Sequence, residues 1–443
     1  MSDLAAAIWG NILSWFFSLF KQSHLLITTY PEEEKGIKNR STNDDRNRSD
    51  SDNTKCILIS QPGGIEQLRM ITLKKGICTL GFNLPECAPA PFVTIDDNNA
   101  TGIENDKSKD AVQLPQDCVI IRNKYFSVNY ADCCIRWGLY ESANKFVGWP
   151  IVPGFDVCGE VEHVGSSIYD LKVGDIVFGC TLFGAYSSRI VIPRLQLRVV
   201  PKNLTLAQAS SLPAVSLTAL YALFLAGHWP KMNNALNNKS ILIHSAAGGV
   251  GSMLVQMSKI LGLSPIVGVV GNSSKVSTAK RLGCDIVIDK SNNNWKEVAC
   301  KASPTGYGCI MDANGISTLQ QSYNLLAPTG RLIVFGFHTN LPINKSMLSP
   351  MSWFSMGYKM LSMPKYDPME LCTDNKSILG FNLSFLSTER NFCTKLMDQI
   401  YDWLVSGELI CSDVTEYNMK DIAMAHSFIQ SGKSIGKIVI KID

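Results

Sequence analysis

The sequence has few of the features that mark nucleic-acid-binding or secreted proteins. Its 443 residues contain no arginine-rich run and no basic patch interleaved with aromatic residues, and the formal net charge is only +3. Nothing in it therefore favours nucleic-acid binding. The 14 cysteines are scattered through apolar stretches and include no Cys-x-x-Cys pair. This use of cysteine indicates reduced, mostly buried thiols in a cytoplasmic protein.

The N-terminal segment, residues 1–27, lacks charge over most of its length. No charged residue occurs between Leu4 and Phe20, and most residues there are large and apolar. The stretch is shorter than the about 20 residues that a membrane-spanning helix needs. We therefore expect a helix that lies in a membrane interface through residues 4–20, which would make the protein membrane-associated. A helix docked on the protein's own surface or on a subunit is the alternative.

A short glycine-rich segment carries most of the functional information. Residues 245–251 read Ser-Ala-Ala-Gly-Gly-Val-Gly and lie between an apolar run, 240–244, and a helical pattern, 252–261. A turn of this kind lets a pyrophosphate approach the backbone, and the helix N-terminus offers N–H groups to its oxygens. The expected contacts with a dinucleotide come from Ala247, Gly248, Gly249, Val250 and Gly251.

The next strand indicates which dinucleotide is bound. Enzymes that use NAD place a carboxylate after this strand, but here Val270 occupies the position. The following residues supply hydroxyl groups and one cation but no acid, a pattern that suits the 2′-phosphate of NADPH; they are Gly271, Ser273, Ser274 and Lys275. Alternatively, Lys275 only solvates the first turn of the next helix.

Periodicity divides the folded part of the chain into a β-rich domain and an α/β domain. Residues 119–200 are dense in short strands and glycine turns, which predicts an antiparallel domain. From residue 205 strands alternate with helices, which predicts a doubly wound parallel sheet. The expected strands are 241–244, 266–270, 285–288, 309–311, 331–335 and 378–383. We therefore predict a disordered linker at 28–55, a β-rich domain at 56–202 with an insertion at 96–109, a cofactor domain at 203–384 and a return to the first domain at 385–443.

Several short motifs recur in a fixed order, and together they carry a family resemblance. They include Gly63-Gly64, Val128-Asn129-Tyr130-Ala131-Asp132, the segments 136–140 and 153–161, Gly174-Asp175, Leu217-Thr218-Ala219 and 246–251. In this order they resemble the zinc-free quinone oxidoreductases of the medium-chain dehydrogenase/reductase superfamily. The motifs at 323–326, 330–332, 380–383 and Gly436-Lys437 are most similar to the vesicle amine transport protein branch. The resemblance implies a GroES-like catalytic domain and a Rossmann cofactor domain.

The resemblance also indicates which residues act in the reaction and that zinc is not one of the participants. Zinc-dependent members hold their metal at three positions that align here with Asn129, Phe155 and Ala214, and these residues are not ligands for zinc. The resemblance implies that Asn129 and Tyr140 act near the nicotinamide and the substrate oxygen. By the same resemblance Thr218 bonds near the nicotinamide or its ribose, and Gly336 allows a loop to pass closely. As alternatives to these catalytic roles, Asn129 caps a turn and Tyr140 forms a wall of the pocket.

The expected function is that of an NADPH-dependent, zinc-independent oxidoreductase. Its substrate would be a small apolar quinone or α,β-unsaturated carbonyl, which accepts hydride without a metal. A 2-enoyl thioester reductase is one alternative, and a membrane-associated NADPH-binding scaffold with little catalysis is another. The resemblance further implies a homodimer that pairs through the edge strand 378–383.

Overall fold

The computed structural model describes residues 53–73, 76–78, 92–94, 114–230, 238–292, 294–337, 361–386 and 389–443. The apolar segment 1–27, the linker up to residue 52 and the insertion 96–109 lie outside the described residues. The first strand already begins at Thr54, so the predicted linker ends too late by two residues. Main-chain pairing of Thr54 with Leu73 and the burial of Thr54 explain this earlier start.

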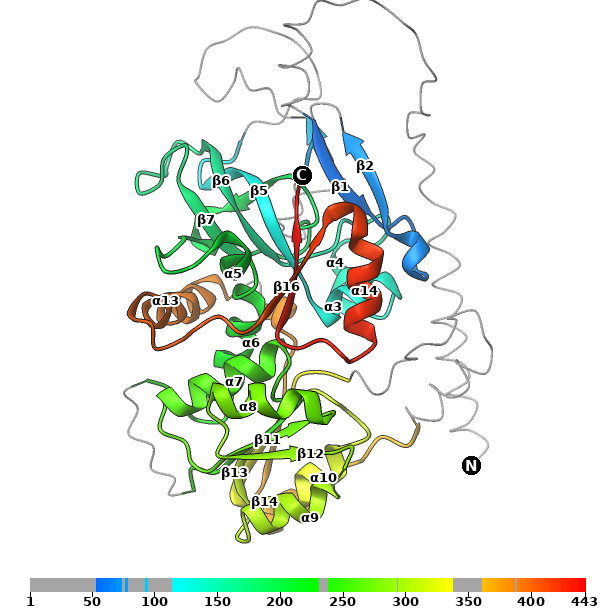
Figure 1. Cartoon of the computed structure of the whole chain (residues 1–443), viewed down its shortest axis with the longest axis vertical. Coiled ribbons are helices and arrows are strands. Elements are labelled where there is room, and N and C mark those ends of the chain that lie inside the picture. Colours follow the sequence, from blue (N-terminus) through cyan, green and yellow to red (C-terminus); the bar gives the residue numbers. More distant parts are fainter. Residues whose placement is uncertain are drawn as a thin grey trace, which may run out of the picture. The chain divides into compact units, whose positions relative to one another are not determined.

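The β-rich domain is built on a nine-stranded sheet, drawn in the upper part of Figure 1. Its strands along one path are β4 (Phe92–Thr94), β3 (Gly76–Cys78), β8 (Arg189–Pro193), β5 (Cys118–Val128), β6 (Asp156–Val164), β7 (Ile176–Cys180) and β9 (Leu197–Val199). A separate hairpin pairs β1 (Thr54–Leu58) with β2 (Arg69–Leu73). The pairs of β5 with β6 and β8, and of β7 with β6 and β9, are antiparallel, which confirms the prediction.

The C-terminal part of the chain completes this sheet. The last strand, β17 (Lys437–Lys441), pairs antiparallel with β5 and parallel with β16 (Val414–Asn418). The helices of this domain are α3 (Tyr130–Arg136), α4 (Glu141–Phe146) and α14 (Ile422–Gln430), with short 3-10 turns at Ile65–Gln67, Arg194–Gln196 and Met419–Asp421. The chain therefore returns to its first domain after passing through the second.

The cofactor domain is a six-stranded sheet in which every neighbouring pair is parallel. Its strand order is β12 (Ile286–Asp289), β11 (Ile266–Val270), β10 (Ile241–His244), β13 (Tyr307–Asp312), β14 (Leu326–Val334) and β15 (Ser377–Gly380). All six strands overlap the predicted ranges. This order, with β10 and β13 at the centre and both faces covered, is the predicted doubly wound Rossmann sheet.

Side chains of alternate residues build a core on each face of this sheet. Ile241 and Ile243 of β10 pack into one cluster, and Leu242 between them packs into the other. The first cluster includes buried residues of α6 (Pro213–Leu225), α7 (Gly249–Ile260) and α13 (Arg390–Ser406). The second includes residues of α9 (Trp295–Ala302) and α10 (Leu319–Asn324). The period of two along β10 therefore decides which helices cover which face.

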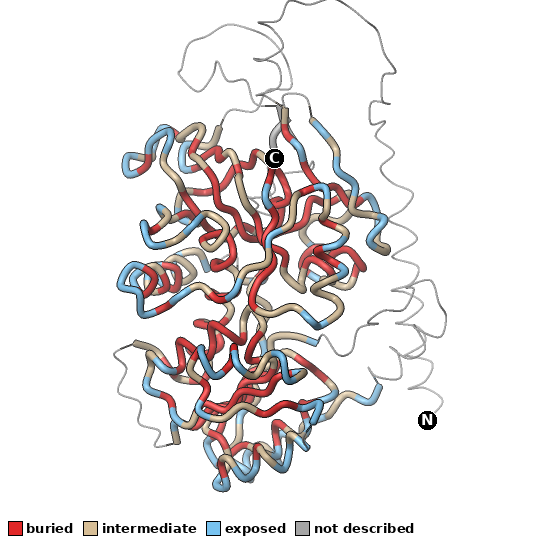
Figure 2. The backbone as a smooth tube through the Cα atoms, viewed as in Figure 1, coloured by how far each residue is buried: buried red, intermediate tan, exposed pale blue. Residues whose placement is uncertain are grey.

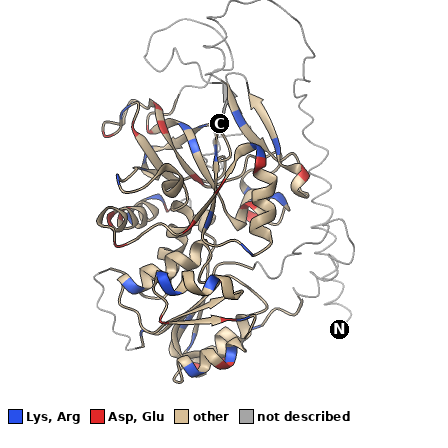
Figure 3. Ribbon diagram, viewed as in Figure 1, with Lys and Arg blue, Asp and Glu red and all other residues tan. Residues whose placement is uncertain are grey.

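The remaining helices are short and connect these elements. They are α5 (Leu206–Ser210), α8 (Val276–Leu282), α12 (Pro368–Asp374) and the 3-10 turns Ser273–Lys275 and Leu383–Leu386. Buried backbone follows both sheets in Figure 2, and exposed backbone follows the outer loops. In Figure 3 charged residues mark α8, whose last turn carries Lys280 and Arg281. Among the described residues no helix is both long enough and apolar enough to cross a membrane.

Candidate functional site

The glycine turn has the local geometry that the sequence predicts. The helix α7 begins at Gly249, five residues after the end of β10, and Gly248 to Val250 are half-buried. A Cβ atom on Gly251 would lie 2.2 Å from the carbonyl oxygen of Ser245, so a larger residue would displace the backbone of the turn. The first N–H groups of α7 have no acceptor within the helix. The turn therefore fits a dinucleotide pyrophosphate at a helix N-terminus.

The C-terminal strand lies directly against this turn. The backbone N–H of Gly436 donates to the carbonyl of Ala247 at 3.0 Å. A Cβ on Gly249 would lie 2.9 Å from Cδ of Lys437, so the missing side chain of Gly249 makes room for the lysine. In the sequence, Gly436-Lys437 belongs to the family resemblance, and no local pattern gives the lysine a role. Its contact with the turn arises from residues almost 190 positions apart.

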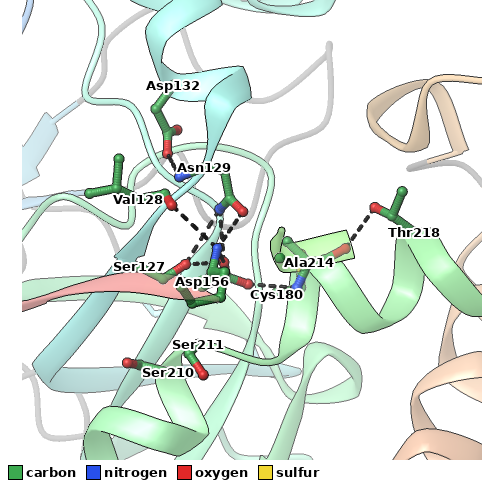
Figure 4. Close-up of polar contacts among 12 residues, drawn as sticks. Ser127, Val128, Asn129, Asp132, Asp156, Cys180, Ser210, Ser211, Ala214 and Thr218 are labelled. Atoms are coloured by element: carbon green, nitrogen blue, oxygen red, sulfur yellow. Dashed lines mark hydrogen bonds and ion pairs between the residues drawn. The ribbon is translucent and has the colours of Figure 1, made fainter. Parts of the chain in front are cut away.

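The buried carboxylate of Asp156, whose contacts with Asn129 and Ala214 are drawn in Figure 4, meets the buried ammonium group of Lys437. Asp156 is fully buried and Lys437 is 4% exposed, and the Nζ to Oδ2 distance between them is 3.7 Å. Asp156 Oδ2 also accepts from the hydroxyl of Ser127 and, at 2.8 Å, from Nδ2 of Asn129. Its Oδ1 accepts from the backbone N–H of Ala214 at 2.6 Å. The buried charge of Asp156 is thus met by hydrogen bonds from three elements and by one cation.

This pair of charges determines the orientation of the Asn129 amide. Lys437 Nζ donates to Asn129 Oδ1 at 2.6 Å, and Asn129 Nδ2 donates to Asp156. An ammonium group can only donate and a carboxylate can only accept, so the amide cannot be flipped. The second hydrogen of Nδ2 faces a weak contact, since Ser127 Oγ lies 3.5 Å away. Lys437 and Asp156 therefore hold the Asn129 amide in one orientation, with Nδ2 as a hydrogen-bond donor.

Asn129 is also the N-cap residue of the helix α3. The alternative interpretation, in which Asn129 caps a turn, therefore applies to its backbone. Its backbone N–H donates to Asp132 Oδ2 at 2.7 Å, and the residue has extended φ and ψ angles at the N-cap position. The side chain is left for Asp156 and Lys437. Burial raises the pKa of Asp132 to about 7, against the lowering effect of this backbone bond. Burial also lowers the pKa of Lys437, against the opposing effect of Asp156.

Three positions correspond to the zinc ligands of zinc-dependent relatives. Asn129 and Ala214 occupy two of them and contact Asp156, and Phe155 occupies the third. Asn129 and Ala214 bond the carboxylate as described above. Phe155 packs its ring against Tyr140 and Phe183, with centroid distances of 6.0 and 5.4 Å. Among the described residues no group of three or more His, Cys, Asp or Glu side chains is arranged to hold a metal ion.

Thr218 lies on α6, one turn after Ala214. Its hydroxyl group donates to the carbonyl oxygen of Ala214 at 2.7 Å (Figure 4). The hydroxyl proton is thereby committed to the helix, and the oxygen can accept from a ligand such as a nicotinamide amide or a ribose hydroxyl. Gly336 follows β14, and a Cβ there would lie 2.9 Å from the carbonyl oxygen of Ala313. Gly336 thus permits a close approach between two loops of the protein.

The hydroxyl group of Tyr140 lies against the end of the cofactor sheet. It bonds Asn382 Oδ1 at 3.1 Å and Ser384 Oγ at 2.9 Å, and both residues follow β15 directly. Burial raises the pKa of Tyr140 to about 12. The phenol therefore stays neutral and can donate a hydrogen bond across the physiological pH range. Sequence reasoning placed Tyr140 near the substrate but missed both of its partners, which lie more than 240 residues away.

The predicted 2′-phosphate site lies next to an acid that comes from a neighbouring strand. Ser273 and Ser274 are exposed, and Lys275 Nζ donates to the carbonyl of Gly432 at 2.7 Å. Residues 271–275 themselves contain no acid, but Ser273 Oγ donates to Asp289 Oδ2 at 2.6 Å. Asp289 ends β12, and the parallel register places it opposite Val270 of β11. A carboxylate from the neighbouring strand thus reaches the serine. Gly271 has open space around its Cβ position, the nearest atom being 4.0 Å away.

Comparisons with known proteins agree with this architecture. Residues 115–202 match the profile described as "Alcohol dehydrogenase GroES-like domain", and residues 249–387 match "Zinc-binding dehydrogenase". Together with the VAT-1 homologues among the relatives below, these matches support a place in the zinc-free quinone oxidoreductase group of the medium-chain dehydrogenase/reductase superfamily, near the VAT-1 homologues. This confirms the resemblance and the fold class that the motifs predict.

Three relatives illustrate the relationship. The synaptic vesicle membrane protein VAT-1 homolog of Danio rerio is 29% identical over 322 residues, which are 73% of this chain and 63% of that protein. The chain thus spans less than two thirds of this relative. The 2-haloacrylate reductase of Burkholderia sp is 27% identical, with 73% and 90% of the two chains covered. The structure of Escherichia coli quinone oxidoreductase complexed with NADPH has a TM-score of 0.65 at 22% identity, with 87% and 99% covered. This last likeness concerns the fold.

Proposed function

We propose that this protein is an NADPH-dependent reductase that transfers hydride to a quinone or an α,β-unsaturated carbonyl without zinc. The observation that carries the proposal is the Asn129 amide, held by Lys437 and Asp156 beside a turn that fits a dinucleotide. Relatives named 2-haloacrylate reductase, 2-methylene-furan-3-one reductase and NADPH-dependent alkenal/one oxidoreductase support the reaction class. NADPH, when bound, supplies the hydride.

The residues of the chain itself bind the cofactor, orient the substrate and stabilise the charge that develops on it. The N-terminus of α7 takes the pyrophosphate, and Thr218 accepts from the nicotinamide end of the cofactor. Asn129 and Tyr140 offer hydrogen bonds to the substrate oxygen, on which negative charge develops as the carbon skeleton accepts hydride. Burial raises the pKa of Tyr140 to about 12, so the phenol stays neutral and donates a hydrogen bond, and the proton that completes the reduction comes from Tyr140 or from solvent.

Zinc independence is supported by the residues at the three relevant positions. An amide, a phenyl ring and a methyl group offer zinc no thiolate or imidazole. The ammonium group of Lys437, one hydrogen bond away from the Asn129 amide, provides the positive charge nearest to this amide. We expect the purified protein to contain no stoichiometric zinc by mass spectrometry. Its turnover should not change after treatment with a strong chelator, and a loss of activity that zinc restores would contradict this part of the proposal.

The choice of NADPH is supported by Lys275 and by the exposed hydroxyl groups of Ser273 and Ser274. Each charge-assisted hydrogen bond to a phosphate is worth about 1.5–3 kcal/mol. Asp289 opposes this preference, because its carboxylate lies next to Ser273. We expect tighter binding of NADPH than of NADH by calorimetry, with the difference lost in Lys275→Met. Equal affinities in the wild type would remove the cofactor assignment.

We also propose a homodimer that forms through β15. This strand ends the six-stranded sheet and pairs on one side with β14, and Ser377 and Gly380 at its ends are exposed. An edge strand of this kind offers unpaired main-chain groups to a second copy. Light scattering should give twice the mass of the chain. A monomer at micromolar concentration would contradict the proposal.

The decisive experiment is NADPH oxidation with a panel of quinones, enones and enoyl thioesters. We expect turnover of quinones or enones, with kcat lowered about 100-fold in Asn129→Ala. Asn203→Ala is the matched control, because this amide bonds the carbonyl of Leu404 away from the site and should keep the wild-type rate. Turnover of thioesters alone would favour the enoyl thioester reductase. Tight NADPH binding without any turnover would favour the scaffold.

A further inference from the structure

The phenol of Tyr140 is held by a segment of the other domain. Tyr140 stands at the start of α4, in the β-rich domain, whereas Asn382 and Ser384 follow the last strand of the cofactor sheet. The carboxyl ends of parallel strands are where open α/β sheets bind their ligands. The contact therefore lies at the edge where the cofactor and the substrate are expected to meet. Neither Asn382 nor Ser384 has a role in the function proposed above.

The donors and acceptors in this contact can be assigned. Asn382 Oδ1 accepts from the backbone N–H of Ser384 at 3.0 Å, which identifies the oxygen end of the amide. The 3.1 Å contact between Tyr140 and Oδ1 is then a bond donated by the phenol. Because the phenol has a single proton, the 2.9 Å contact with Ser384 is donated by the serine hydroxyl. Tyr140 thus gives one hydrogen bond and receives another from the same short segment.

Aromatic contacts complete the placement of the ring. The ring of Tyr140 meets Phe155 and Phe183 edge-on, with centroid distances of 6.0 and 6.4 Å. Phe155 precedes Asp156, whose carboxylate fixes the Asn129 amide. The ring therefore has an apolar support in its own domain and a polar one in the cofactor domain. The contacts with Asn382 and Ser384 are the ones that orient the hydroxyl group toward the cofactor domain.

We propose that Asn382 and Ser384 are positioning residues that align the Tyr140 hydroxyl with the substrate oxygen. The proposal rests on the proposed reductase function and adds two residues to it. A bound substrate oxygen would take the phenol hydrogen bond from Asn382, while Ser384 continues to donate to the phenol oxygen. Because Asn382 Oδ1 also accepts from the backbone N–H of Ser384, loss of Asn382 would displace both partners of the hydroxyl group, and a displacement of about 1 Å can lower a rate by up to 100-fold.

The kinetic test is a double-mutant cycle between Asn382→Ala and Tyr140→Phe. We expect N382A to lower kcat about tenfold, with the Kd for NADPH unchanged. The same change should have no further effect in the Y140F background. Phe385→Leu is the matched control, because Phe385 packs on Phe146 of α4 but does not touch the hydroxyl, and it should keep the wild-type rate. Equal losses from N382A in both backgrounds, or no loss, would overturn the proposal.

A second readout does not need turnover and separates this inference from the proposed function. Tyrosines labelled at ¹³Cζ give one resonance each, and the signal that disappears in Y140F belongs to Tyr140. This signal should shift in N382A and in Ser384→Ala but stay in place in F385L. A Tyr140 signal unaffected by N382A would overturn the inference whether or not the protein reduces quinones. A shifted signal in a protein without turnover would refute only the reductase function.

Discussion

Replacing Lys437 with methionine tests whether the buried charge pair holds the site together. Methionine keeps most of the length of the side chain and removes the ammonium group. That group lies 2.6 Å from Asn129 Oδ1, 3.3 Å from the carbonyl oxygen of Val128 and 3.7 Å from Asp156 Oδ2. The variant leaves a fully buried carboxylate with three hydrogen-bond donors but without a neutralising charge.

The size of the effect follows from the distance and the burial. Two unit charges 3.7 Å apart attract each other by about 4–5 kcal/mol at an effective dielectric constant of about 20. Removing one partner of a buried pair typically costs about 3–5 kcal/mol, because the other charge stays buried without compensation. We therefore expect Lys437→Met to lower the free energy of unfolding by about 3–5 kcal/mol. The rate of turnover should also fall, because the Asn129 amide loses the donor that orients it.

Urea unfolding of the apoprotein, followed by tryptophan fluorescence, measures the loss. The matched control is Arg281→Met, which removes the same charge from the exposed pair between Arg281 and Asp413. Exposed pairs contribute about 0–1 kcal/mol. Combining K437M with Asp156→Asn should be less destabilising than the sum of the two changes, since no unpaired charge remains. A loss below about 1 kcal/mol for K437M, the range of an exposed pair, or strict additivity of the double variant, would refute the reasoning.

Three further predictions concern the cofactor, acid stability and the turn. Asp289→Asn should raise the ratio of NADPH to NADH affinity, because it removes the negative charge beside Ser273; an unchanged ratio in calorimetry would contradict this. Burial lowers the pKa of His426 to about 3, so the unfolded chain takes up a proton below pH 6.5 that the native state refuses. Native stability should then fall with decreasing pH, by up to about 1.4 kcal/mol per pH unit. Urea unfolding between pH 4 and 7 should therefore show a steeper loss of stability in the wild type than in His426→Gln. The comparison cancels the opposite contribution of Asp132, which both proteins share, and equal pH dependence of the two proteins would contradict the prediction. Gly251→Ala should weaken binding of both coenzymes at least about tenfold, because a Cβ there meets the Ser245 carbonyl at 2.2 Å; unchanged affinity would contradict a rigid turn.

Much of the fold follows from local patterns in the sequence. The strands β10 and β11 have the predicted bounds, because their short runs of Ile, Val and Leu are buried on both faces and are bounded by turn residues. The bounds of β14 were less accurate. This strand begins at Leu326, five residues before the predicted start, and passes through Thr329 and Gly330, which resemble a turn in the sequence. Pairing with β13, including an irregular register, extends the strand through these residues.

The site was predictable only where its residues are close in the sequence. The glycine turn and the residues after β11 each lie in one short segment, so their spacing carries the signal. Lys437 and Asn129 are 308 positions apart, and Tyr140 and Asn382 are 242 apart. Asp289 reaches Ser273 through the parallel register of two strands. Contacts of this kind depend on how strands are ordered in the sheet, which no local pattern specifies.

The course of the last strand explains why such distant residues had to meet. β17 follows α14 and pairs with β5, and Gly436, the residue before it, bonds the glycine turn of the cofactor domain. Gly436 bonds the turn through its backbone, and the next residue, Lys437, bonds Asn129 through its side chain. One dipeptide therefore joins the glycine turn to the Asn129 amide, for which we propose a contact with the substrate. The same dipeptide contacts both the turn and the Asn129 amide, so a change at Lys437 acts on both. This coupling makes Lys437 a more informative position to perturb than any glycine of the turn.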